Sequence, residues 1–164
     1  LFVSSIAIDP PQRVPGTAIF LTGKREGAPR ALLHNMKHNK VLHENVLLLT
    51  VATARVPYVS DTERLVFESL GQGINRMVLT YGFMERPHLP DALQRIPSSV
   101  FHYDEMDATF FLGRETVRVS PTGSALSRLR RQVFVLMSRN ATSAAKFFHL
   151  PANRLVEIGA QIEI

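Results

Sequence analysis

Hydrophobic residues recur along the chain at two spacings, and these spacings predict an alternation of strands and helices. Two nearly continuous apolar, β-favouring runs, at 17–22 and 46–53, predict strands, the second of them buried on both faces of a sheet. Between them, apolar residues within 29–40 recur at helical spacing and predict a short helix. A strand–helix–strand order favours parallel strands joined by a right-handed crossover.

The rest of the chain extends this pattern. Residues 64–70 and 74–83 flank a glycine turn and predict an antiparallel hairpin. Further strands are predicted at 109–112 and 116–119, as one strand interrupted around Gly113-Arg-Glu115, and at 154–164; further helices are predicted at 91–96, 124–139 and 142–149. The predicted fold class is therefore α/β, with α+β as the alternative: a mixed sheet with a βαβ start, a hairpin in the middle and helices packed on the sheet.

The first fifteen residues are predicted to be a linker, and 16–164 to be a single domain. Residues 9–15 contain three prolines, which argue against a helix or an internal strand. The chain begins at Leu1 without the basic region and cleavage site of a signal peptide, so we expect it to be a piece of a longer protein.

Composition narrows the class of protein. With 45% apolar and 20% charged residues the chain has an ordinary globular composition, and it has no cysteine for disulfides or thiol chemistry. No apolar run approaches the roughly 18 residues of a transmembrane helix. The net charge of +5 favours an anionic neighbour, which leaves nucleic acid, a nucleotide or an acidic membrane surface open.

Three enzyme signatures fail on spacing, and the chain is therefore predicted not to be an enzyme. No Gly-x-Ser-x-Gly nucleophile elbow is present. His43-Glu44 begins like a zinc-protease helix, but Leu47 stands where the second histidine is needed. Residues 23–27 lie where a phosphate loop would lie, yet they are followed by Ala28-Pro29 instead of Lys and Ser or Thr. We predict no catalytic residue.

The helix at 29–40 carries the first candidate contacts. His34 and His38 are four residues apart and would share one helix face, which raises the alternative of a metal site. Asn35 and Lys37 fill the gap, and neither a cysteine nor a carboxylate lies within the helix. We therefore prefer a polar face whose imidazoles and amides bond to backbone groups of neighbouring loops. The four residues are also the candidate ligand or regulatory contacts, and we predict neither a metal nor a cofactor.

Arginines supply the other candidate contacts. Arg128 and Arg131 lie on the helix at 124–139 and favour a solvated face or a docking surface for anionic lipid or ligand. Arg114 interrupts an apolar strand, where we expect an ion pair, with ligand contact as the alternative. Phe147 and Phe148 are expected in the core, so stacking on nucleic-acid bases is unsupported and no nucleic-acid partner is predicted.

Five segments in order resemble the C-terminal cytosolic domain of Kup (Kup/HAK/KT) potassium uptake transporters. They are Arg13-Val-Pro-Gly-Thr-Ala-Ile-Phe-Leu-Thr22, Leu32-Leu-His-Asn-Met-Lys-His-Asn-Lys-Val-Leu-His-Glu44, Tyr81-Gly-Phe-Met-Glu85, Thr109-Phe-Phe-Leu-Gly-Arg-Glu115 and Leu150-Pro-Ala-Asn-Arg-Leu-Val-Glu-Ile-Gly159. Each segment alone is weak, but five in the expected order are specific, and they span nearly the whole chain.

The resemblance implies a cytosolic regulatory or assembly domain that follows a multi-pass membrane region, on the cytoplasmic side of the cell (inner) membrane. The full-length protein would take up potassium, with protons as the coupling ion. The implied partners are the transmembrane region of the same polypeptide, a second copy in a homodimer, and a cyclic dinucleotide of the cyclic di-AMP type. The basic charge balance and the arginines add anionic lipid head groups as an alternative partner.

Overall fold

The structure is a computed structural model that describes residues 2–118 and 143–163. Its helices are α1 (Phe2–Ile8), α2 (Arg30–Asn39), α3 (Asp61–Arg64), α4 (Leu89–Gln94), α6 (Ala144–Phe147) and the 3₁₀ helix η1 (Ala152–Arg154). Its strands are β1 (Gln12–Leu21), β2 (Val41–Thr53), β3 (Leu65–Gly71), β4 (Ile74–Tyr81), β5 (Ala108–Arg118) and β6 (Leu155–Glu163).

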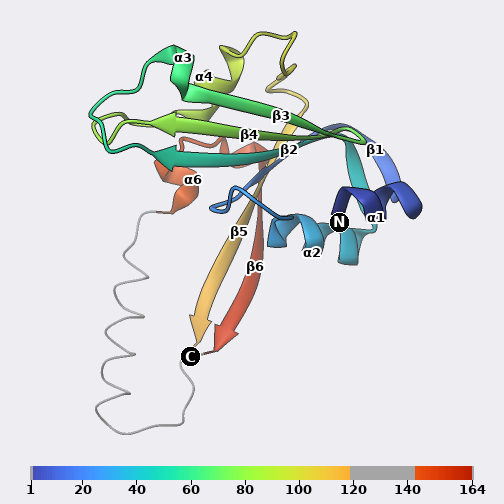
Figure 1. The fold of residues 1–164 in the computed structure, drawn as a ribbon. Helices are drawn as coiled ribbons and strands as arrows, with labels where there is room; N and C mark the ends of the chain where they lie inside the picture. The colour runs from blue at the N-terminus through green and yellow to red at the C-terminus, as the bar shows by residue number, and fades with distance from the viewer. Residues whose placement is uncertain (1, 119–142, 164) are drawn as a thin grey trace, which may run out of the picture.

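The six strands form one mixed sheet in the order β3-β4-β2-β1-β5-β6 (Figure 1). β3 pairs antiparallel with β4, and every other neighbouring pair is parallel. β1, α2 and β2 form the predicted βαβ unit, and β3 and β4 form the predicted hairpin. The predicted fold class is confirmed.

Alternate residues of the strands point to opposite faces of the sheet, and both faces are covered. On one face, Phe20, Leu48 and Ile74 pack with α1 and α2. On the other, Ile19, Leu47 and their neighbours pack with α4 and with the segment that leads to β5. The two central strands are therefore nearly continuously apolar, because neither of their faces meets water.

The hairpin turn explains why glycine stands beside Gln72. Gln72 and Gly73 have φ angles of 55° and 70°, the left-handed conformation that a two-residue hairpin turn requires. The Arg13 guanidinium donates hydrogen bonds to the carbonyl oxygens of His43 and Gln72, at 2.8 and 2.6 Å. This side chain thereby ties β1 to β2 and to the turn.

Several features differ from the sequence expectations. Gln12, Arg13 and Val14 pair with β2, whereas 9–15 was expected to lie outside the sheet; the register shifts between Val14 and Thr17, which places Pro15 at a bulge. β5 runs through Gly113 without interruption. The helix α1 was not predicted, yet its Ile6 is buried. Phe147 is exposed instead of lying in the core, whereas Phe148 packs against it.

The predicted helix at 124–139 lies outside the described residues. None of the helices in the part of the chain that the structure describes is long and apolar enough to cross a bilayer.

Candidate functional site

The structure separates the four candidates on α2 into two groups. His34, Lys37 and His38 are exposed, and the His34 and His38 rings lie 5.8 Å apart between centroids. Asn35 is buried, with 4% of its surface exposed. Within the described residues, no group of three histidine or carboxylate side chains is placed to hold a metal ion.

Asn35 has a structural role in ending the helix. Its Nδ2 donates to the Val41 carbonyl oxygen at 3.2 Å, and its Oδ1 accepts from Asn39 Nδ2 at 2.8 Å. Between them, Lys40 takes the left-handed conformation of a helix C-cap and donates its N–H to the Met36 carbonyl. A buried amide thus fixes the exit from α2 into β2.

Arg114 forms the expected ion pair, with Glu157 of β6 at 3.3 Å. Its side chain is 70% exposed, so the expectation of an apolar surrounding was wrong: beyond Leu112, β5 no longer pairs with β1. The α2 candidates and Arg114 do not share a described pocket. Arg128 and Arg131 lie outside the described residues.

A pocket of about 630 Å³ lies elsewhere, where β4 ends. Its lining combines apolar and aromatic side chains of β3, β4 and α4 with charged side chains. The lining includes Tyr58, Asp61, Arg64, Leu65, Leu79, Tyr81, Glu85, Arg86, His88, Asp91, Arg95 and Ile96. Ligands of open α/β sheets commonly bind at the carboxyl ends of strands, and β4 ends here.

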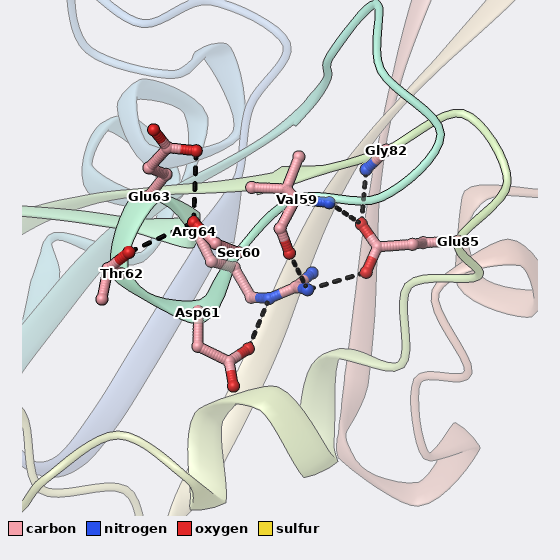
Figure 2. A network of polar contacts seen from close by, with 8 residues as sticks. All are labelled: Val59, Ser60, Asp61, Thr62, Glu63, Arg64, Gly82 and Glu85. Carbon is pink, nitrogen blue, oxygen red and sulfur yellow. Dashed lines mark hydrogen bonds and ion pairs between the residues drawn. The ribbon is translucent and has the colours of Figure 1, made fainter.

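Figure 2 shows a polar network centred on Arg64 and Glu85. Both of these side chains line the pocket. Arg64 Nη2 lies 2.7 Å from Glu85 Oε1 and also donates to the Val59 carbonyl oxygen at 2.8 Å. Glu85 Oε2 accepts from the backbone N–H groups of Val59 and Gly82. The network therefore joins the segment after β2 to the segment after β4.

The electrostatics follow from these contacts. The hydrogen bond from Arg64, together with the N–H groups of Gly82 and Val59, lowers the pKa of Glu85 to about 2. The hydrogen bond to Glu85 raises the pKa of Arg64 above its ordinary value. The Arg64 guanidinium also lies 4.9 Å from the centre of the Tyr81 ring, whose pKa is raised by burial.

Gly82 allows the two segments to approach each other. A Cβ atom at this position would overlap the carbonyl group of Pro57, and the N–H of Met84 donates to that same carbonyl at 3.2 Å. Phe83 N–H donates in turn to the Val56 carbonyl at 3.0 Å. Only glycine leaves room for this contact.

The arginines and carboxylates around the pocket are equal in number, but not all of them form ion pairs within the described part of the chain. Three arginines and three carboxylates line it. Arg64 is bound to Asp61 and Glu85, and Asp91 lies 3.2 Å from His88 Nδ1. Arg86 and Arg95 form no ion pair with another described residue, so they are the cations available to an anionic group.

Sequence reasoning did not assign this pocket. The signal nearest to it was Tyr81-Gly-Phe-Met-Glu85, which carried the family resemblance without a role for its glutamate. Its partner Arg64 lies 21 residues earlier, and no local spacing indicates that the two side chains meet.

Comparison with known proteins decides the family. A family model described as the K+ potassium transporter C-terminal domain matches residues 15–164. The chain belongs to this family.

Individual relatives support the same family assignment. The probable potassium transport system protein Kup of Aromatoleum aromaticum is 52% identical over 163 residues, which are 99% of this chain and 25% of the relative. The Kup protein of Myxococcus xanthus is 49% identical over 164 residues, and Kup 2 of Rhizorhabdus wittichii is 50% identical over 164; each match covers 100% of this chain and 25% of the relative. The chain thus spans about a quarter of the length of relatives whose names describe potassium transport and no enzymatic reaction. No solved structure matches it.

Proposed function

We propose that this chain is the cytosolic regulatory and assembly domain of a Kup-type potassium uptake transporter, without chemistry of its own. The match to the transporter C-terminal domain over nearly the whole chain, at a quarter of the relatives' length, carries this proposal. A multi-pass membrane region of the same polypeptide would carry the ions, with proton coupling, and residues 1–15 would connect to it. The domain would lie on the cytoplasmic side of the inner membrane, and a second copy would pair with it in a homodimer.

Transport assays test this proposal directly. We would measure rubidium uptake in potassium-uptake-deficient cells that carry a full-length transporter with this domain, the same transporter lacking residues 16–164, or the domain alone. We expect no uptake from the domain alone and an altered rate from the shortened transporter at equal membrane abundance. Equal rates with and without the domain would refute a regulatory or assembly role.

A second candidate function is nucleotide sensing of the cyclic di-AMP type, and the pocket favours it. Arg86 and Arg95 are available to phosphate groups, while Tyr58 offers an exposed ring for a base. The α2 face of His34, Lys37 and His38 and the arginines Arg128 and Arg131 remain rival contacts.

Melting temperatures with cyclic di-AMP and with ATP test this candidate. A ligand that binds only the folded state at 100 times its Kd stabilises that state by about 2.7 kcal/mol. If the pocket binds it, Arg86→Gln with Arg95→Gln abolishes the shift, while Lys37→Gln with His38→Gln does not. The reverse result assigns the α2 face, and no shift with either nucleotide refutes nucleotide sensing.

A further inference from the structure

Four large apolar side chains project into solvent from two adjacent loops. They are Val56, Tyr58, Phe83 and Met84, with 48%, 66%, 60% and 60% of their surfaces exposed. The loops follow β2 and β4, which are parallel neighbours, so both loops leave the sheet at the same edge (Figure 1). Clustered exposure of this kind marks an interaction site more often than scattered apolar residues do.

The two loops hold these side chains outward on a fixed backbone. Their main chains are joined by the hydrogen bonds from Phe83 and Met84 to the carbonyl groups of Val56 and Pro57, and by the close packing of Gly82. Glu85 links Val59 to the other loop (Figure 2). These contacts hold the loop backbones in place, and the four side chains are left accessible to an external partner.

The charges beside these side chains indicate the chemistry of that partner. Arg55 and Arg86 flank the apolar group, are exposed, and form no ion pair with another described residue. Of the acidic neighbours, Glu85 and Asp61 are bound to Arg64, and Glu63 accepts a hydrogen bond from Ser60. An apolar centre with a tyrosine and flanking arginines matches the interfacial region of an acidic bilayer, where aromatic rings lie at head-group level and arginines meet phosphates.

A protein partner fits less well, because the exposed apolar area is small. Four side chains that each present roughly 100 Å² fall short of the roughly 800 Å² per partner of a stable protein–protein interface. An interfacial membrane contact needs no such area, because a few inserted apolar side chains and nearby cations suffice for reversible binding.

We propose that loops 54–60 and 82–86 form a membrane-contacting platform, which places Val56, Tyr58, Phe83 and Met84 in the interfacial layer of an acidic bilayer. This goes beyond the proposed regulatory function. It rests on the loops alone, so its test needs no transport activity.

The chain contains no tryptophan, so a single introduced tryptophan is an unambiguous reporter. We would titrate Phe83→Trp with phosphatidylcholine vesicles that contain about one third phosphatidylglycerol, and with pure phosphatidylcholine vesicles. Leu33→Trp is the matched control, because Leu33 is a large apolar residue of α2 with 45% of its surface exposed. We expect a blue shift of the emission for Phe83→Trp with the acidic vesicles and none for Leu33→Trp.

Sedimentation with the same vesicles measures affinity. We expect Phe83→Ser with Met84→Ser to weaken binding about tenfold or more, Leu33→Ser to leave it unchanged, and Arg55→Gln with Arg86→Gln to reduce it and its salt dependence. Circular dichroism would verify that each variant is folded. Failure of the parent chain to bind acidic vesicles, or binding that survives the Phe83 and Met84 substitutions, would overturn the proposal. Self-association abolished by those substitutions, without vesicle binding, would overturn it in favour of a second copy.

Discussion

Replacing Glu85 with glutamine tests whether the Arg64–Glu85 network holds the two loops together. The substitution keeps the size of the side chain but removes the charge that pairs with Arg64, and it turns one acceptor into a donor. A partly buried ion pair that loses one partner leaves the other without compensation, so we expect a loss of stability.

The lowered pKa of Glu85 gives the expected size of this loss of stability. The difference between 4.5 and about 2 corresponds to an upper limit of about 3 kcal/mol, at 1.36 kcal/mol per pH unit. The pair lines an open pocket, and 17% of the Glu85 side chain is exposed, so solvent screening reduces the contribution to about 1–2 kcal/mol. Because the folded-state pKa is lowered, this stability is present above about pH 4.5 and is lost as the pH falls through about 2.

Urea unfolding of the parent chain and of the Glu85→Gln variant, at several pH values, measures the loss of stability and its pH dependence. We expect a difference of about 1–2 kcal/mol near neutral pH, which narrows as the pH is lowered from about 5 toward about 3. Glu68→Gln is the matched control, because Glu68 also pairs with an arginine, Arg76 at 3.0 Å, but its side chain is 57% exposed; we expect about 0.5 kcal/mol or less. A Glu85→Gln difference that is no larger than the control, or that does not change with pH, would refute the reasoning.

Three further predictions concern single positions. Gly82→Ala should destabilise by about 2 kcal/mol or more in urea unfolding, because its Cβ overlaps the Pro57 carbonyl, whereas Gly113→Ala, with open space around it, should change little. Asn35→Ala should cost about 1–3 kcal/mol in the same assay, since it removes both hydrogen bonds of a buried amide; an effect within error would contradict its capping role. Burial lowers the pKa of His43, whose Nδ1 has no hydrogen-bond partner among the described residues. Because the folded state disfavours the charged imidazole, stability should fall as the pH drops below about 6.5. His43→Phe should reduce this pH dependence of the melting temperature, measured in thermal melts at stepped pH.

The sheet could be predicted from the sequence because its central strands are apolar on both faces. Residues 46–53 leave no polar side to suggest a helix, and the glycines beside Gln72 fix the hairpin. The error at 9–15 has a local cause. Pro15 cannot donate a hydrogen bond to the sheet, but the bulge between Val14 and Thr17 removes the need for one, and β5 pairs with β1 only from Thr17 onward.

The pocket could not be predicted in the same way. Arg64 ends a helix of four residues, and Glu85 lies in a turn after β4. They meet only because β3 folds back on β4 and because β2 and β4 are parallel neighbours. On α2, the spacing of the polar residues correctly indicated a polar face but could not show that Asn35 points into the protein.

Substitutions in the two loops can distinguish residues that would contact the membrane from residues that hold the loops in place. Phe83 and Met84 are exposed, so their replacement by serine should leave stability within about 0.5 kcal/mol and weaken vesicle binding. Glu85 is partly buried and accepts hydrogen bonds from Val59 and Gly82, so Glu85→Gln should reduce stability and vesicle binding together. If Glu85→Gln lowered stability without changing the affinity for vesicles, the network would stabilise the fold alone. The outward orientation of the apolar side chains would then need another explanation. A loss of both would mean that the ion pair stabilises the fold through the same contacts that shape its surface.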